Sequence, residues 1–295
     1  MDQAEQLRNI IKAGNVKRSR PLARVITVTS GKGGVGKSNT AINLAIQFRK
    51  MGKKVVILDA DFGLANIEIM FGAVPKHNLS DLIYQGKNIK DIITWGPMEV
   101  GFISGGSGIT GLSNLSKDYL TYIVHNLAEL DTIADVIIVD TGAGISDAVL
   151  EFLVASGEIL LVTTPEPTSI TDSYSLLKAL NGHPGLERDN TQICMIANRV
   201  STANEGEVLF QKLDVVVSRY LKLPITYLGA VLQDPLLAKA VMQQLPVSLQ
   251  NPQARSAQAY EEIAAKLMKQ DEGQNTQKRG VAAFFSHIIG KRNNG

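Results

Sequence analysis

One eight-residue segment constrains the fold of this chain more than any other feature. An apolar run at residues 24–30 (RVITVTS) is followed by Gly31-Lys32-Gly33-Gly34-Val35-Gly36-Lys37-Ser38, and a helix-forming stretch at residues 37–51 comes next. This is the pattern G-x-x-x-x-G-K-[ST] in the strand–loop–helix context that it requires. Small residues let successive backbone N–H groups curl around phosphate oxygens, and the helix N-terminus adds its dipole. The segment therefore predicts a phosphate-binding loop.

The rest of the chain repeats the alternation of strand and helix. Further short apolar runs lie at residues 55–60, 100–104, 135–140, 158–163, 192–198 and 226–230. Helix-forming stretches lie at residues 117–130, 146–156, 168–180, 204–222 and 253–269. The runs are nearly continuous in apolar residues, as in strands that are buried on both faces of a parallel sheet. We predict an α/β fold with one three-layer, doubly wound, mostly parallel sheet whose ligands lie at the carboxyl ends of the strands.

Composition fits one large domain with two short arms. The 295 residues include 44% hydrophobic and 20% charged side chains, which excludes disorder as the overall state. Polar segments at residues 14–21 and 270–278 are typical of linkers. We expect an N-terminal partner-binding segment with a basic linker at residues 1–21, a nucleotide-binding body at 22–269, and a linker with an amphipathic helix at 270–295.

Charge and cysteine content exclude several classes of protein. Thirty Lys and Arg oppose 28 Asp and Glu, and the net charge of +2 argues against binding nucleic acid by bulk charge. The single cysteine, Cys194, excludes an internal disulfide framework and a multi-cysteine zinc or iron–sulfur site within one chain. The sequence shows neither a signal peptide nor an apolar run of the ~18 residues that span a bilayer, so we expect a reducing, cytoplasmic setting.

Charged residues near the phosphate-binding loop suggest a magnesium–nucleotide site. Lys37 is expected to bridge the β- and γ-phosphates, and the Ser38 hydroxyl to ligate Mg²⁺. Asp59 and Asp140 end apolar strands, where carboxylates are costly unless a metal or hydrogen bonds satisfy them. Mg²⁺ is held mostly through water with one or two carboxylates. Asp140 is the predicted anchor of the ion, and Asp59 supports it.

A second lysine, Lys32, makes the loop more specific. The run KGGVGKS resembles the deviant Walker A motif of the MinD/ParA family of P-loop ATPases, residues 58–66 resemble its switch I, and residues 138–144 resemble its Walker B and switch II segment. Gly142 is a departure, because family members often have Pro-Ala-Gly there. The resemblance implies that Lys32 reaches across an ATP-bound homodimer to the partner's phosphates and that Asp61 positions the attacking water. It implies ATP hydrolysis that stays slow until dimerisation.

The base is expected to be adenine. A guanine site would show an N-K-x-D-like segment, whereas the strand at 192–198 ends Asn198-Arg199-Val200-Ser201. The resemblance implies that Asn198 contacts adenine, with Arg199 as a weaker candidate beside it. Gln233-Asp234-Pro235 resembles the loop beside the base but is equally compatible with a helix start. The predicted nucleotide-binding residues are Gly31, Lys32, Gly33, Gly34, Val35, Gly36, Lys37, Ser38, Asn39, Asn198 and Arg199.

A second glycine pattern is not expected to bind a dinucleotide. Residues 106–111 (GSGITG) match G-x-G-x-x-G, and Asp131 follows them. The dinucleotide motif requires an acid at the end of a second strand, whereas Asp131 closes the helix predicted at 117–130. We expect residues 106–111 to form a surface loop.

The C-terminal tail has the pattern of an amphipathic helix with basic flanks. Its apolar residues recur at helical spacing, and Lys278, Arg279, Lys291 and Arg292 flank them. The tail resembles the membrane-targeting helix of MinD-type proteins, which implies peripheral binding to the anionic inner face of the cell membrane in the ATP-bound state. Docking on the protein's own body is the alternative. The predicted membrane-contacting residues are Val281, Phe284, Phe285, Ile288 and Ile289.

The N-terminal segment points to a partner. Asp2, Gln3, Ala4, Leu7 and Arg8 belong to a stretch that resembles the DQAxxLR segment of the flagellar-number regulators of the FlhG type. That resemblance implies binding and stimulation of FlhF, a signal-recognition-particle-type GTPase, and contacts with flagellar C-ring components. A plain capping helix is the alternative.

Three functions therefore remain open on the sequence. The first is a membrane-recruited ATPase switch that regulates flagellar number or placement. The second is a MinD-type positioning protein for the division site. The third is a ParA-like DNA-partitioning ATPase that uses the 12 basic residues found, without an acid, between Glu5 and Asp59. Because much of that basic run belongs to the phosphate-binding loop and its helix, no specific nucleic acid is expected as a partner.

Overall fold

The computed structural model describes residues 22–61, 66–105, 117–273 and 280–291. Their strands form one eight-stranded sheet in the order β3-β4-β2-β5-β1-β6-β7-β8. The strands are β1 (Arg24–Thr29), β2 (Val55–Ala60), β3 (Thr94–Trp95), β4 (Gly101–Ser104), β5 (Val136–Thr141), β6 (Glu158–Thr163), β7 (Gln192–Val200) and β8 (Thr226–Leu232). All pairs are parallel except β3 with β4. The predicted fold class and each predicted strand are confirmed, and only the two-residue edge strand β3 was missed.

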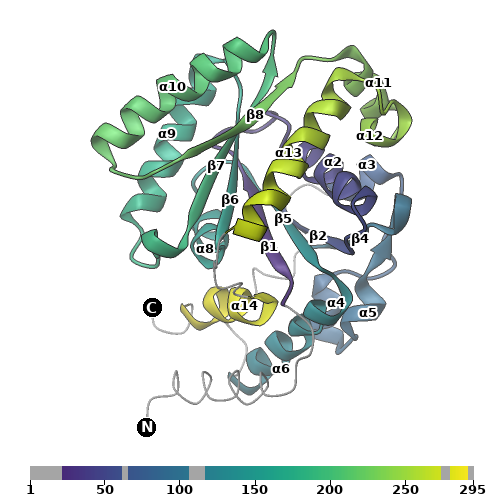
Figure 1. Cartoon of the computed structure of the whole chain (residues 1–295). Coiled ribbons are helices and arrows are strands. Elements are labelled where there is room, and N and C mark those ends of the chain that lie inside the picture. The colour runs from purple at the N-terminus through teal and green to yellow at the C-terminus, as the bar shows by residue number, and fades with distance from the viewer. Residues whose placement is uncertain (1–21, 62–65, 106–116, 274–279, 292–295) are drawn as a thin grey trace.

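Helices cover both faces of the sheet (Figure 1). They are α2 (Lys37–Lys50), α3 (Asn66–Phe71), α4 (Leu79–Gln85), α5 (Ile89–Ile92), α6 (Lys117–Ala128), α7 (Leu130–Ile133), α8 (Asp147–Ala155), α9 (Pro167–Gly182), α10 (Ala203–Tyr220), α11 (Pro235–Met242), α12 (Val247–Gln250), α13 (Arg255–Gly273) and α14 (Gly280–Lys291), with 3₁₀ turns at Pro97–Glu99 and Arg188–Asn190. One core joins α2, α3 and α13 to the sheet. Two further cores join the sheet to α8, α9 and α10 and to α4, α6 and α14.

Strand β5 lies at the centre of the sheet, beside the strand that leads into the phosphate-binding loop. Every residue of β5 is buried, and β5 lies between β1 and β2. A strand buried on both faces needs apolar side chains on both, which is why the run Val136–Val139 shows no alternation. The arrangement sets the carboxyl ends of β1, β2 and β5 side by side.

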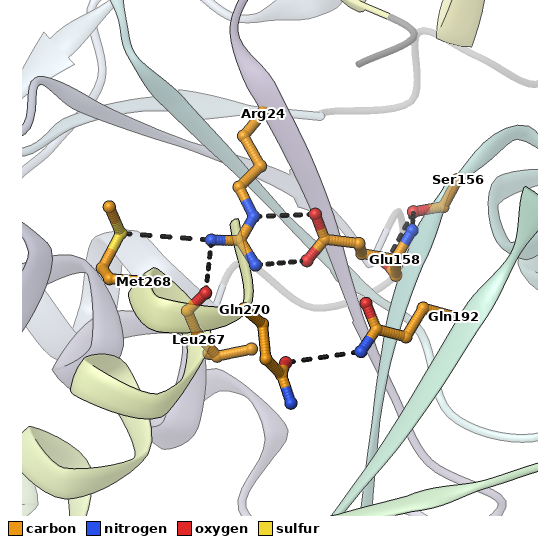
Figure 2. Close-up of polar contacts among 7 residues, drawn as sticks. All are labelled: Arg24, Ser156, Glu158, Gln192, Leu267, Met268 and Gln270. Atoms are coloured by element: carbon orange, nitrogen blue, oxygen red, sulfur yellow. Dashed lines mark hydrogen bonds and ion pairs between the residues drawn. The ribbon is translucent and has the colours of Figure 1, made fainter. Parts of the chain in front are cut away.

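An ion pair between a buried arginine and a half-buried glutamate fixes the opposite, amino end of the sheet (Figure 2). The Arg24 guanidinium donates to both carboxylate oxygens of Glu158, from Nε at 2.7 Å and from Nη2 at 2.6 Å. Its Nη1 donates to the Leu267 carbonyl at 2.9 Å. The pair therefore ties β1 to β6 and to α13, and the two-bond geometry sets their relative position.

The C-terminal helix packs on the body in this structure. Val281, Phe284, Phe285 and Ile288 are at most 3% exposed and belong to one core with residues of α6, α8 and β5. The Phe284 ring lies 6.0 Å from the Phe152 ring of α8, centre to centre. Docking on the body, the alternative that the sequence left open, is therefore the observed state, and a membrane role requires release. The side chain of Ile289 lies outside the described residues.

One carboxylate joins the start of the body to the start of the tail. Asp131, in α7, is 5% exposed, and its Oδ1 accepts from the backbone N–H of Ala23 and of Val281, both at 3.1 Å. Asp131 was expected only to end a helix, and this clasp is a role that sequence reasoning missed. Helix α13 also continues to Gly273, so the first residues of the predicted linker at 270–278 are helical.

Candidate functional site

The phosphate-binding loop leaves β1 and enters α2 as the sequence predicts. Gly36 is the residue before α2 and adopts a left-handed conformation with φ 99°, which favours glycine. The Ser30 hydroxyl donates to the Lys32 carbonyl at 2.7 Å and closes the beginning of the loop. Lys37 opens α2 and is only 8% exposed. The loop thus holds a buried ammonium group at the N-terminus of a helix, where a phosphate would bind.

Helix α9 supports the loop from behind. A Cβ atom on Gly31 would overlap the backbone carbonyl of Asp172, in α9. The contact leaves no room for any side chain larger than hydrogen at this position. Gly31 is therefore required for packing as well as for the approach of phosphate.

Asn198, near the end of β7, also supports the phosphate-binding loop. Its Nδ2 donates to the Val35 carbonyl at 2.7 Å, its Oδ1 accepts from the Arg199 N–H at 2.9 Å, and the residue is 2% exposed. The predicted contact with adenine stays a prediction, and the side chain already has a role in holding the loop. Arg199 is exposed at the end of this segment with φ 56°.

Two predicted metal-site carboxylates lie on neighbouring strands. Asp59 on β2 is in register with Asp140 on β5. Burial raises the pKa of Asp140 to about 7, although the nearby Ser38 hydroxyl and Lys37 ammonium act in the opposite direction. Burial also raises the pKa of Asp59 to about 6, against the hydrogen bonds it accepts from the Ile67 and Asp61 N–H groups. Burial therefore makes the ionised form of both carboxyl groups costly in free energy.

The surroundings of Asp140 fit a hydrated Mg²⁺ ion. Among the described residues, neither carboxylate oxygen of Asp140 makes a hydrogen bond of ordinary geometry, although the side chain is fully buried and the Ser38 hydroxyl is near enough to lower its pKa. Orphaned acceptors of this kind require a cation or its water ligands. Ser38 and Asp140 would hold the ion between them, with Asp59 in support, and the ion would neutralise charge on the phosphates. In the described part of the chain, no group of three or more His, Cys, Asp or Glu forms a separate metal site.

Asp61 lies where both predicted switch segments meet. The Asn66 side-chain amide donates to Asp61 Oδ2 at 3.3 Å, and the Gly142 backbone lies close to Oδ1. The Gly144 N–H donates to the Ser30 carbonyl at 3.0 Å, which connects switch II to the loop. Asp61 is half-buried and can receive a proton or orient a water, as its predicted role requires.

Lys32 projects to the exposed mouth of the site. Its Nζ donates to Glu166 Oε2 at 2.7 Å and to the Thr168 hydroxyl at 2.9 Å, both at the start of α9. The hydrogen bond and positive charge of Lys32 lower the pKa of Glu166. The side chains are 37% and 55% exposed, so water screens the pair and Lys32 can exchange partners. Sequence reasoning missed Glu166, although its place just after β6, the neighbour of β1, was a usable signal.

The segment at Gln233-Asp234-Pro235 forms a helix start, one of the two roles that the sequence left open for it. Asp234 is the N-cap of α11, its Oδ1 accepts from the Leu236 N–H at 2.9 Å, and Pro235 occupies the first turn. Its Oδ2 also accepts from the Ser256 N–H and hydroxyl. The helix start is confirmed, and a contact with the base stays a prediction.

Two of the predicted segments lie outside the residues that the structure describes. They are the partner-binding residues at positions 2–8 and the glycine pattern at residues 106–111. In the described part of the chain, none of the helices is both long and apolar enough to cross a membrane.

Sequence comparison identifies related proteins along most of the chain. A family model described as ParA, an NUBPL iron-transfer P-loop NTPase, matches residues 21–268. The antiactivator FleN of Pseudomonas aeruginosa is 38% identical over 244 residues, which cover 83% of this chain and 86% of FleN. The flagellum site-determining protein YlxH of Helicobacter pylori is 32% identical over 295 residues, which cover 98% of both chains.

Solved structures agree on the fold. The septum site-determining protein MinD of Pyrococcus horikoshii, in complex with Mg-ADP, has a TM-score of 0.67 and 24% identity, and the match covers 85% of this chain and 98% of MinD. A ParA family ATPase from Chlorobium tepidum has a TM-score of 0.66 at 20% identity, covering 83% of this chain and 99% of that ATPase. At such identities the likeness establishes the fold alone.

Proposed function

The chain belongs to the ParA/MinD family of P-loop NTPases, as an ATPase of the FlhG type that uses ATP and Mg²⁺, and from this premise we propose that it is a dimerising switch for flagellar number or placement. Two relatives support this proposal by their names, the flagellum site-determining protein YlxH and the antiactivator FleN. The iron-transfer description of the family model is not carried over, because the chain has one cysteine.

We assign each step of ATP hydrolysis to one of the residues described above. Lys37 and the loop N–H groups bind the β- and γ-phosphates, and Ser38 with Asp140 holds the metal. Asp61 orients the attacking water. Lys32 of a second subunit neutralises charge on the transferred phosphoryl group, so hydrolysis is slow in the monomer.

The observation that carries the switch is the exposed position of Lys32. In one subunit it is bound to Glu166 and cannot also reach a partner's phosphates. Formation of the ATP dimer would exchange this contact for one with phosphate, which an exposed ion pair permits at low cost.

Light scattering with ATP and with ADP tests the switch. The wild type is expected to form dimers with ATP and monomers with ADP, and Lys32→Ala to stay monomeric and lose hydrolysis while retaining some nucleotide affinity. Cells whose own copy carries Lys32→Ala should show altered flagellar number. ATP-dependent dimers of Lys32→Ala would refute the role of this lysine.

The N-terminal segment is proposed to stimulate an FlhF-type GTPase. Leu7, Ile10 and Ile11 would present a short apolar face to a groove on the GTPase, as amphipathic helices commonly do. Leu7→Asp is expected to abolish stimulation of GTP hydrolysis and to leave ATP hydrolysis unchanged. Equal stimulation by the wild type and by Leu7→Asp would contradict this assignment.

The tail is proposed to bind the membrane after it leaves the body. Burial of each large apolar side chain contributes roughly 1.5–3 kcal/mol, so the docked tail is strongly held. Helix α8 follows switch II directly and carries Phe152 against Phe284, which gives the nucleotide site a physical route to the tail. Two released tails on one dimer would bind anionic lipid with higher avidity than one. The protein would then move between the cytoplasm and the inner face of the membrane.

Asp131→Ala is expected to weaken the hold on the tail. The change leaves the N–H groups of Ala23 and Val281 without this acceptor, at a cost of about 1–3 kcal/mol for each buried group. The variant should float with anionic vesicles even in ADP. Asp135→Ala is the matched control, because Asp135 also accepts from a backbone N–H, that of Lys54, but at an exposed position. Equal flotation of both variants would contradict the release model.

A further inference from the structure

A group of exposed apolar side chains lies beside the two segments that border the nucleotide site. Ile69 in α3 is 60% exposed, Val74 after it 89%, Met242 at the end of α11 86%, and Leu245 44%. We call these four side chains the switch-side patch. None of these side chains belongs to the core that holds α14.

One contact and a shared neighbour bring its halves together. Gly72 lies between Ile69 and Val74 in the chain, and Gln244 lies between Met242 and Leu245. The Gln244 side chain lies against the Cα of Gly72, within ordinary contact of where a Cβ would be. Helices α3 and α12 also both pack against α2 in the same core (Figure 1). The four apolar side chains therefore lie on adjoining segments.

Helix α3, which carries Ile69, is hydrogen-bonded at its start to the predicted catalytic and metal-site carboxylates. At the beginning of α3, the Ile67 N–H donates to Asp59 Oδ2, and the Asn66 amide donates to Asp61 Oδ2, each at 3.3 Å. A rearrangement at either carboxylate would therefore act on the start of a helix only six residues long. Ile69 lies within that helix, and Val74 follows it closely.

Helix α11, which ends at Met242, starts after its N-cap Asp234, in the loop that resembles the base-binding segment. A displacement of either segment changes the fit of the two halves across Gly72 and Gln244. The patch is thus placed to differ between nucleotide states.

The charges around the patch select the kind of partner. Residues 69–80 and 235–254 each contain an exposed lysine, Lys76 and Lys239, and no acidic residue. Of the carboxylates that border these ranges, Asp81 and Asp234 already accept hydrogen bonds from backbone N–H groups, which leaves Glu68 as the acid next to Ile69. An apolar surface with a basic rim is complementary to an amphipathic helix that carries acidic residues beside its apolar face. A second copy of the chain would have to bring the same basic rims together.

We propose that the switch-side patch binds an acidic amphipathic helix of a partner protein and that the bound nucleotide controls its affinity. The proposal goes beyond the flagellar switch, because it assigns a separate effector surface next to switch I. It rests on the exposed apolar side chains and on the two exposed lysines beside them.

Fluorescence anisotropy with a labelled model peptide tests the proposal. The probe is a short amphipathic helix of leucine and glutamate, compared with the same helix carrying lysine in place of glutamate. The wild type is expected to prefer the glutamate peptide and to bind it with different affinity in ATP and in ADP. The double variant Val74→Ser, Met242→Ser should weaken binding about tenfold or more, and Lys76→Glu with Lys239→Glu should reverse the peptide preference.

The matched control is Val215→Ser, since Val215 is 62% exposed on α10, away from the switch segments. Equal peptide affinity of the patch variant and the Val215 variant would overturn the proposal, and equal affinity in ATP and ADP would overturn nucleotide control. Light scattering of the same variants separates this result from the dimer switch. If the patch variant loses ATP-dependent dimers, the occupant is a second copy and the partner assignment is wrong.

Discussion

Asp140→Asn is expected to stabilise the nucleotide-free protein while reducing ATP hydrolysis by about a hundredfold. The carboxyl of Asp140 is fully buried and makes no hydrogen bond of ordinary geometry among the described residues. Burial raises its pKa to about 7 from 3.8, against the opposing effect of the nearby Ser38 hydroxyl. A neutral amide of the same shape removes the cost of burying the charge. It also removes the anionic ligand that the metal requires.

The sign of the pH dependence follows from the same shift. Between about pH 4 and pH 7 the carboxyl of the unfolded chain is ionised while that of the folded chain keeps its proton. The wild type without nucleotide therefore loses stability as the pH rises through this window, on the order of a few kcal/mol. Asp140→Asn lacks this loss, so its advantage in thermal unfolding should be small near pH 4 and largest above pH 7.

Asp135→Asn serves as the control for this measurement. Asp135 lies just before β5, the strand that carries Asp140, is exposed, and can keep its hydrogen bond to the Lys54 N–H as an amide. Its stability and hydrolysis should match those of the wild type. If Asp140→Asn were less stable than the wild type at pH 8, Asp140 would have a partner that the described contacts do not include.

Gly31→Ala is expected to destabilise the protein by roughly 3 kcal/mol and to abolish nucleotide binding. The new methyl group would overlap the Asp172 backbone, which belongs to helix α9 and cannot move as a flexible side chain can. The loop and α9 must separate, and the loop then loses the shape in which its N–H groups face phosphate. Thermal unfolding without nucleotide measures the packing cost directly.

Gly33→Ala is the matched control within the same loop. The nearest atom to a Cβ at this position is the Cβ of Ala143, at 4.0 Å, so the methyl group fits. Its stability without nucleotide should stay within about 0.5 kcal/mol of the wild type. If both alanine variants lost the same stability, the close approach of Gly31 to α9 would not be the cause.

Local patterns were sufficient for the fold and for the placement of the predicted site residues at one edge of the sheet. The strand–loop–helix context of residues 24–51 fixed the phosphate-binding loop, and near-continuous apolar runs fixed the strands. Asp59 and Asp140 could be paired because the carboxyl ends of parallel strands meet at one edge of the sheet. Short elements such as β3 and α12 were missed, because two to four residues carry too little periodicity to detect.

Contacts between distant residues could not be predicted in the same way. Asn198 against Val35, Glu166 against Lys32, and Asp131 against both Ala23 and Val281 join residues more than 100 positions apart. Each of these side chains alone is compatible with a turn, a solvated surface or a helix end. Their partners depend on how the layers pack.

The C-terminal helix shows most clearly which features the sequence predicts and which depend on tertiary structure. Helical spacing of Val281, Phe284, Phe285 and Ile288 determined that one face of this helix must leave water. It did not determine what would cover that face, because a lipid surface and a protein groove impose the same apolar stripe. The packed core with α6 and α8 decided it for this state of the molecule. The sequence by itself determined the strand–loop–helix segment and the sheet, because these depend on local residue patterns. The tertiary structure alone decided that the C-terminal helix packs on the body, because this depends on contacts between residues far apart in the chain.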